Sequence, residues 1–138
     1  MDSNLVVTFN NHHTIKGKLF SKIIAKVPLN QNSYVVYQVP CSNYSGVYVG
    51  ETCQLLEKRM ARHELDIQKQ IDCTALSSHH NSTGHNFNFN DVSILGRASN
   101  IKKRKILEVL YILENSYSLN FKSDTAHIMN EYTNLITF

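Results

Sequence analysis

The sequence is poor in the residues that mark fibrous, disordered and disulfide-bonded proteins. Its 138 residues include only 5 Gly, 2 Pro and 3 Cys. Few Gly and Pro beside a hydrophobic fraction of 42% exclude collagen-like, low-complexity and disordered chains. Three cysteines cannot pair completely, so we expect free thiols or a metal ligand instead of a disulfide framework. The length fits one compact domain with a short arm.

Long apolar runs are missing as well. No stretch approaches the roughly 20 residues that span a bilayer. The first residues also lack the charged-then-apolar pattern of a secretory signal. We therefore expect an intracellular protein with no membrane partner. The formal net charge of +3 is compatible with a nucleic-acid partner but does not require one.

The basic residues are clustered along the chain. Three groups stand out: Lys16, Lys18, Lys22 and Lys26; Lys58, Arg59 and Arg62; and Lys102, Lys103, Arg104 and Lys105. Clusters of this kind are usually solvated helix faces, but they also suit contacts with a phosphate backbone. If the partner is DNA, we expect Arg62 and residues 102–105 to contact it.

Hydrophobic periodicity divides the first half of the chain into segments. Apolar residues recur at helical spacing over 14–27, which predicts a basic amphipathic helix within an N-terminal arm, residues 1–32. Residues 34–39 and 46–50 are rich in Val and Tyr and are separated by a polar stretch. This pattern predicts a β-hairpin.

Helices dominate the rest of the chain. After the hairpin, apolar residues and a histidine repeat along one side of a predicted helix: Leu56, Met60, His63, Ile67 and Ile71. Thr52 is the candidate N-cap of this helix. The later predicted elements are a helix over 74–82 ended by Gly84, one or two strands within 87–94, a helix over 101–114 capped by Ser99 or Asn100, and a tail, 123–138, with a short helix near 126–135. The order of the middle elements is therefore β-β-α-α-β.

One set of polar residues suits a specific chemistry. Arg59 and His63 are four residues apart and lie on one face of their helix. If that helix packs over the hairpin, Tyr37 and Tyr48 lie at the same edge, and Glu108 can join them from the later helix. Phosphodiester cleavage needs a cation for the phosphate, a proton acceptor for water and a carboxylate for a divalent metal.

Taken one at a time, these residues also have ordinary structural explanations. Glu108 follows Arg104 by one helical turn, the spacing of a surface ion pair. Tyrosines in strands are usually core residues with a hydroxyl at the edge, and Arg59 and His63 fit an exposed helix pair. Only the complete set favours chemistry.

The ordered set resembles the GIY-YIG nuclease domain. The matching segments are Val35-Val36-Tyr37, then Tyr48-Val49-Gly50 after ten intervening residues, then Arg59 and His63, and finally Glu108. The sequence is closer still to the endonuclease domain of Penelope-like retroelements, because VVYQVPC, VYVGET, ALSSHH, STGHNF and RKILEVLYI occur in that order. The resemblance covers residues 34–120. The first motif departs from the family by reading Val-Val-Tyr in place of Gly-Ile-Tyr.

The resemblance implies an α+β domain, residues 33–122, with a small, mostly antiparallel sheet of three strands flanked by helices. It also implies a metal-dependent DNA endonuclease that nicks its substrate and uses one Mg²⁺ or Mn²⁺ ion. Glu108 would hold the metal and Arg59 would bind the scissile phosphate. Tyr37 would orient or deprotonate the attacking water, and Tyr48 would share that role.

The remaining matched positions are polar. His63 and His79 match family histidines, and Asn120 matches a polar position near the end of the domain. In Penelope-like elements the nick exposes a 3′-hydroxyl that a reverse transcriptase extends. The implied partners are therefore DNA and a reverse transcriptase domain of the same element, in the nucleus. Two alternatives remain: a structure-specific repair or recombination nuclease, and a nucleic-acid-binding module that has lost turnover.

A second group of residues resembles a metal site. Cys41, His79 and His85 are the candidate zinc ligands, but relatives carry a second cysteine where Tyr44 or a neighbour stands here. A closed tetrahedral zinc site needs four ligands, so we do not expect structural zinc and expect no cofactor beyond the catalytic metal. His79 cannot readily serve both sites, and His80 is available for one of the roles.

Overall fold

The computed structural model describes residues 31–131, so the helix predicted over 14–27 lies outside the described residues. The elements are, in order, β1 (Val35–Pro40), β2 (Val47–Thr52), α3 (Leu56–Gln68), α4 (Ala75–Thr83), β3 (Ser93–Arg97), α5 (Ile101–Glu114) and α6 (Lys122–Glu131). This confirms the predicted order β-β-α-α-β and the following helix. Among these elements, no helix has the length and apolar character needed to cross a membrane.

The three strands form one antiparallel sheet in the order β2-β1-β3. The predicted α+β class with a small antiparallel sheet is confirmed. Strand β1 lies in the centre, where Tyr37 is opposite Gly50 and Val39 is opposite Tyr48 on β2. Because side chains alternate along a strand, Tyr37 and Tyr48 share one face of the sheet. Strand β2 is left at an edge.

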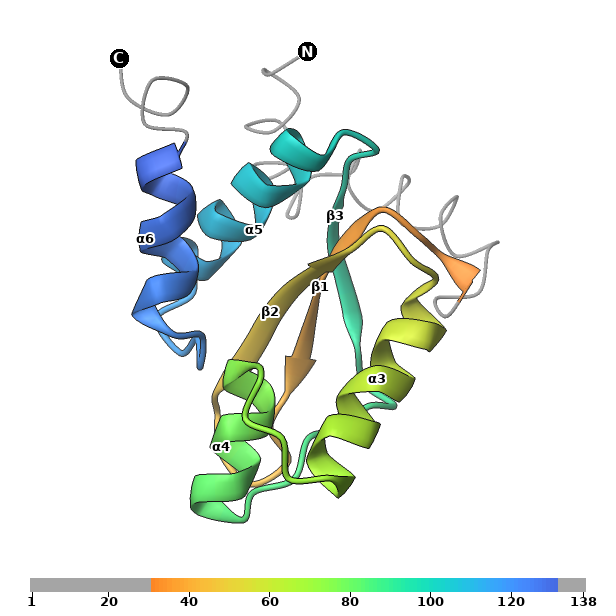
Figure 1. The fold of residues 1–138 in the computed structure, drawn as a ribbon, viewed down its shortest axis with the longest axis vertical. Coiled ribbons are helices and arrows are strands. Elements are labelled where there is room, and N and C mark those ends of the chain that lie inside the picture. The colour runs from red at the N-terminus through yellow and green to blue at the C-terminus, as the bar shows by residue number, and fades with distance from the viewer. Residues whose placement is uncertain (1–30, 132–138) are drawn as a thin grey trace, which may run out of the picture.

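Helices cover both faces of the sheet (Figure 1). Helices α3 and α4 pack on the face of Tyr37 through a buried cluster that includes Leu56, Met60 and Leu76. Helix α5 packs on the opposite face through Leu107, Tyr111 and Ile112, and α6 lies beside α5. The sheet therefore separates α3 from α5.

The helix ends follow local capping chemistry, with one exception. Thr74 caps α4 in a capping box with Ser77, and Gly84 ends it in the left-handed conformation at φ 76°. Asn100 is the cap of α5. The prediction that Thr52 caps α3 is wrong, because Thr52 belongs to β2 and its hydroxyl accepts from the Gln54 N–H at 3.0 Å.

The segment after α5 closes part of the open edge of β2. The Val47 N–H donates to the Tyr117 carbonyl at 3.0 Å, and the Leu119 N–H donates to the Val47 carbonyl at 2.8 Å. The Asn120 side chain continues this pattern like a short strand. Its Oδ1 accepts from the Val49 N–H at 3.0 Å and its Nδ2 donates to the Val49 carbonyl at 2.8 Å. Helix α6 then begins at Lys122, earlier than the tail helix predicted near 126–135.

A buried ion pair ties α5 to β2. Arg104 is 2% exposed, and its Nε donates to the Glu51 carboxylate at 2.9 Å. Its Nη1 donates to the Ala98 carbonyl at 3.0 Å, and the guanidinium lies 5.7 Å from the centre of the Tyr34 ring. The expectation that Arg104 contacts DNA is therefore wrong, because its donors are directed into the protein.

Arg104→Ala tests this role through stability. The substitution leaves Glu51 partly buried without its main partner, so we expect the free energy of unfolding to fall by about 3 kcal/mol, as for other broken buried pairs. Urea unfolding followed by circular dichroism measures the change. Lys102→Ala is the matched control, because Lys102 is an exposed cation on the same helix and its loss should leave the unfolding midpoint unchanged. Equal stability of the two variants would contradict the assignment.

Candidate active site

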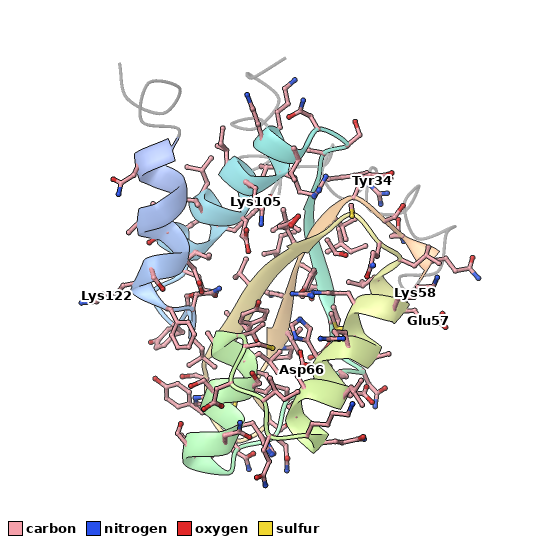
Figure 2. All side chains as sticks on the ribbon, in the orientation of Figure 1. Tyr34, Glu57, Lys58, Asp66, Lys105 and Lys122 are labelled. Carbon is pink, nitrogen blue, oxygen red and sulfur yellow. The ribbon has the colours of Figure 1, made fainter. Side chains whose placement is uncertain are left out.

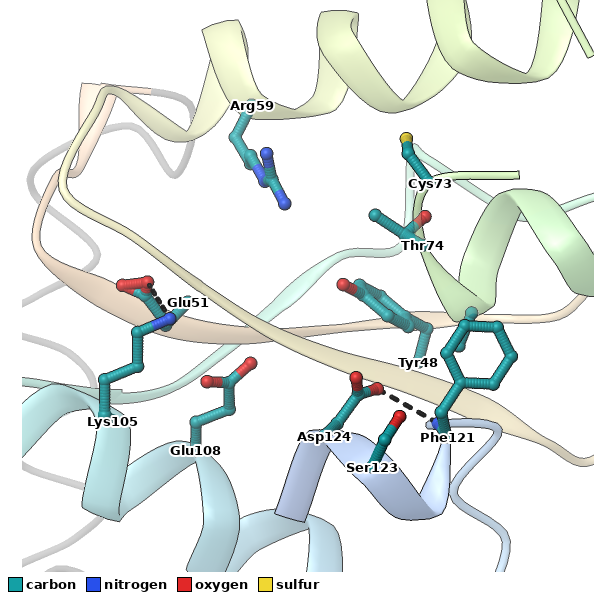
Figure 3. Close-up of a pocket in the computed structure, with 11 residues that line it drawn as sticks. Tyr48, Glu51, Arg59, Cys73, Thr74, Lys105, Glu108, Phe121, Ser123 and Asp124 are labelled. Carbon is teal, nitrogen blue, oxygen red and sulfur yellow. Dashed lines mark hydrogen bonds and ion pairs between the residues drawn. The ribbon is translucent and has the colours of Figure 1, made fainter. Parts of the chain in front are cut away.

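A cavity of about 410 Å³ opens at the edge of β2, next to the place where Asn120 bonds Val49. Its polar and charged walls include Tyr48, Glu51, Arg59, Lys105, Glu108 and Asp124. Figure 3 shows β2 crossing between Arg59, which descends from α3, and Glu108, which rises from α5. Side chains from the two faces of the sheet therefore meet at its edge, and the predicted residues Tyr48, Arg59 and Glu108 line one space.

Tyr37 and His63 lie behind this cavity in the core. The Tyr37 hydroxyl accepts a hydrogen bond from Arg59 Nε at 3.2 Å and lies 2.8 Å from His63 Nε2. Both Tyr37 and His63 are fully buried and neither lines the cavity. The i, i+4 spacing of Arg59 and His63 does bring them to one partner, but that partner is Tyr37. His63, which matches a family histidine, therefore contacts Tyr37 and does not line the cavity.

Both of these inner groups are neutral at pH 7. Burial raises the pKa of Tyr37 to about 12, although the adjacent Arg59 opposes the shift. Burial also lowers the pKa of His63 to about 3, and the positive charge of Arg59 acts in the same direction. The phenol and the imidazole therefore form a neutral support beneath Arg59.

Tyr48 is the tyrosine that faces the cavity. Its ring centre lies 6.5 Å from that of Tyr37 and 5.3 Å from that of His63. Burial raises its pKa well above the ordinary value. The glycine of the second motif makes this close approach of the two tyrosines possible, because a Cβ added at Gly50 would lie 2.5 Å from the Tyr37 hydroxyl and 3.0 Å from Cε1 of Tyr48.

Glu108 has the properties of a carboxylate that needs a ligand. It is half-buried, and within residues 31–131 no hydrogen-bond or ion-pair partner satisfies it. Burial raises its pKa to about 7, against the lowering effect of Lys105. The surface pair with Arg104 considered from the sequence does not form, because Arg104 binds Glu51. A partly buried carboxylate facing a polar cavity fits an oxygen ligand of Mg²⁺ or Mn²⁺.

The other predicted cations occupy different places. Lys105 lines the cavity, where its Nζ lies 3.3 Å from Glu51 Oε2. Lys102 and Lys103 lie on the first turn of α5 and do not line the cavity. Arg62 is exposed on α3 and pairs with Asp66 at 3.2 Å. Of the expected DNA contacts, Lys105 is therefore the one that lines the cavity.

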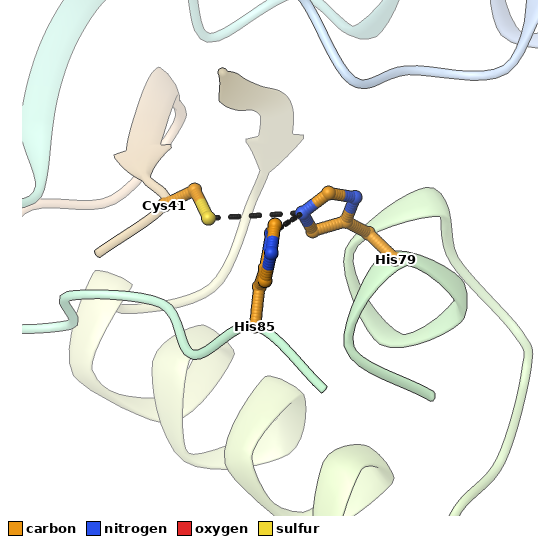
Figure 4. Close-up of side chains that lie close together, drawn as sticks. All are labelled: Cys41, His79 and His85. Carbon is orange, nitrogen blue, oxygen red and sulfur yellow. Dashed lines mark hydrogen bonds between the residues drawn. The ribbon is translucent and has the colours of Figure 1, made fainter. Parts of the chain in front are cut away.

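His79 belongs to a separate cluster and not to the cavity (Figure 4). Its Nε2 lies 3.6 Å from Cys41 Sγ and 3.2 Å from His85 Nδ1. The ligand atoms of Cys41, His79 and His85 all lie within 4.8 Å of one another, and the described part of the chain adds no fourth Cys, His, Asp or Glu to them. His80 bonds the His85 carbonyl at 2.8 Å. His79, which matches a family histidine, therefore does not line the cavity that holds Arg59 and Glu108.

Several cavity residues were not predicted from the sequence, among them Glu51, Phe121 and Asp124. Glu51 directly follows the second motif. Because side chains alternate along β2, Glu51 and Tyr48 lie on opposite faces of the sheet, and the edge position of β2 lets both line one cavity. Asp124 comes from α6, a segment expected to be a tail outside the nuclease domain, and Phe121 lies directly before α6, inside the expected domain. Their sequence context carries no signal that would have identified them.

Comparison with known proteins gives one family. A family model described as the GIY-YIG catalytic domain matches residues 33–120. No curated protein and no solved structure matches the chain. The matched range begins just before β1 and ends at Asn120, so it contains Tyr37, Tyr48, Arg59 and Glu108 but not α6.

Glu108→Gln tests the electrostatic state of the cavity through stability. In the folded chain the pKa of Glu108 is about 7, above its ordinary value of 4.5. The protonated carboxyl therefore contributes stability that is present below pH 4.5 and is lost as the pH rises through 7. We expect Glu108→Gln to raise the free energy of unfolding by roughly 1–2 kcal/mol at pH 8, allowing for screening by solvent, and to change it little at pH 5.

Urea unfolding in the presence of a chelator measures both differences. The control is Glu114→Gln, which removes an exposed carboxylate from the last turn of the same helix and should give no difference between the two pH values. A Glu108→Gln variant no more stable than the parent at pH 8 would show that this carboxylate is well solvated.

Proposed function

Because the chain belongs to the GIY-YIG family, and is therefore a nuclease that hydrolyses phosphodiester bonds, we propose that it is a metal-dependent endonuclease that nicks DNA. We also propose that it acts as the endonuclease domains of Penelope-like retroelements do, by exposing a 3′-hydroxyl for a reverse transcriptase domain of the same element. This role requires DNA as a partner and access to the nucleus. The sequence resemblance over residues 34–120 supports it.

The observation that carries the proposal is the meeting of Arg59 and Glu108 in one cavity. Their helices cover opposite faces of the sheet, so this meeting is not a consequence of ordinary core packing. A fixed guanidinium can bind two oxygens of a phosphate at once. A carboxylate across the cavity can hold the metal that the same phosphate binds.

We assign the protein groups as follows. Arg59 binds and neutralises the scissile phosphate, and Tyr37 holds its guanidinium in place through the hydrogen bond to Nε at 3.2 Å. Tyr48 orients the attacking water, because it is the phenol that lines the cavity. His63 supports Tyr37 from the core, and Lys105 offers a second cation to the phosphate. Asn120 positions β2 and does not contact substrate.

Glu108 is the residue that would hold Mg²⁺ or Mn²⁺. Such an ion neutralises charge on the phosphate and lowers the pKa of a bound water. With one carboxylate ligand, the affinity depends on the ionisation of Glu108 and rises as the pH passes 7. We assign no zinc to the Cys41 cluster, because a closed tetrahedral site needs four ligands and the described residues supply three.

The test is conversion of supercoiled plasmid to open circles by the full chain with Mg²⁺, Mn²⁺ or a chelator. We expect nicking with either ion and none with the chelator. Glu108→Gln and Arg59→Ala should each lower the rate by about 100-fold or more, as does loss of other groups that stabilise transition-state charge. The matched controls are Glu114→Gln on α5 and Lys58→Ala, whose side chain projects from α3 away from the sheet (Figure 2). Both controls should cut at the parent rate.

Each other outcome has a definite meaning. Cutting by Glu108→Gln at the parent rate would exclude the assigned metal ligand. Linear product without open circles would exclude nicking. Strong preference for branched over plain duplexes would favour a repair or recombination nuclease. DNA binding without cutting under any ion would identify a module that has lost turnover.

A further inference from the structure

Phe121 is an exposed apolar residue in a cavity lined mainly by polar and charged residues. It is 43% exposed and lines the same cavity as Arg59 and Glu108. Figure 3 shows its ring beside Tyr48 and the start of α4, at the end of the cavity away from Lys105. Single exposed apolar residues are common on protein surfaces. A ring at the wall of a phosphate-binding cavity is different, because it can contact the substrate.

The backbone that carries this ring is held by hydrogen bonds. The Phe121 N–H donates to Asp124 Oδ2 at 3.0 Å, and the Asp124 N–H donates back to the Phe121 carbonyl at 3.0 Å. The preceding residue, Asn120, is bonded to both the N–H and the carbonyl of Val49 on β2. The aromatic ring is thus presented on a rigid turn between the sheet and α6. A ligand that contacts it does not have to order a loop first.

The chemistry of the cavity selects the kind of ligand. Arg59 and Lys105 offer cations to a phosphate, while Phe121 offers the flat face of an aromatic ring. A nucleotide carries both a phosphate and a planar ring, and it is the substrate unit of the proposed nuclease. The cavity volume of about 410 Å³ lies within the range of small-molecule pockets, roughly 300–1,000 Å³. A nucleotide therefore suits this space better than an isolated phosphate group.

We propose that Phe121 stacks on the base next to the scissile phosphate, and that the chain therefore prefers DNA in which this base is unpaired. This inference rests on the proposed nuclease function and specifies its substrate. Inside a continuous duplex both faces of a base are covered by its neighbours. A free face exists in a bulge, a gap, a flap or a single strand, and an aromatic ring can cover it without regard to base identity.

The test measures binding separately from cutting. The cut position is first mapped with the parent chain and Mg²⁺ on a duplex that carries one unpaired nucleotide. Affinity is then measured with the full-length Glu108→Gln chain, which binds without turnover, for this DNA and for the same DNA with an abasic residue at the mapped position. We expect the base to improve the affinity about tenfold, within the range reported for stacking on aromatic side chains.

Variants at position 121 identify the source of that difference. Adding Phe121→Ala should bring the ratio of the two affinities close to one, and Phe121→Tyr should restore it. The matched control is Tyr117→Ala, because Tyr117 is an exposed aromatic residue that does not line the cavity. This control should keep the tenfold ratio. In cutting assays with Glu108 intact, Phe121→Ala should lose the preference for unpaired over continuous duplex DNA.

The outcomes that overturn the inference are distinct from failure of the proposed function. If Phe121→Ala weakens binding to intact and abasic DNA by the same factor, the ring supports the fold and does not stack on a base. If the parent cuts continuous duplex as well as the unpaired substrate, the inferred preference is wrong while the nuclease function stands. If the parent binds and cuts none of these DNAs, both are wrong.

Discussion

The open edge of strand β2 is the constraint on which the site depends. A sheet normally keeps the side chains of its two faces apart, and here the faces carry different helices. At an edge, however, side chains from both faces can reach past the backbone. Asn120 bonds the edge of β2 at Val49. Next to it the edge is open, and there Tyr48 and Glu51, which lie on opposite faces of β2, line one cavity with Arg59 and Glu108. A longer covering segment on β2 would close this opening, so the length of the 117–120 segment defines the site.

Precise placement of Arg59 requires polar groups to be buried, and this lowers stability. The Tyr37 hydroxyl and His63 sit in the core, and within the described residues the His63 Nδ1 atom has no hydrogen-bond partner. A buried unpartnered polar atom typically costs about 1–3 kcal/mol. Ordinary packing would replace the pair by apolar residues of similar size. Their retention beneath a cavity-lining guanidinium is the kind of departure from ideal packing that functional sites show.

The fold was largely predictable from the sequence, whereas the depth of each site residue was not. Alternation in β1 and β2 and the 3.6-residue period of α3 are local signals, so the element order followed directly. The i, i+4 spacing of Arg59 and His63 indicates a shared helix face but not whether the side chain reaches a cavity or the core. Arg104 shows the same limit, because a run of cations looks exposed until the position of Glu51 across the sheet edge is known. The position of His79 depended on long-range packing against Cys41.

The charges around the cavity explain why metal and phosphate binding should be coupled. Two cations, Arg59 and Lys105, face three carboxylates, Glu51, Glu108 and Asp124, so the ionised cavity has a small excess of negative charge. Such a cavity repels a phosphate on its own. Protonation of Glu108 removes the excess, and a divalent cation bound by its carboxylate reverses the sign. Burial is the main cause of the raised pKa of Glu108, and the nearby carboxylates of Glu51 and Asp124 raise it further.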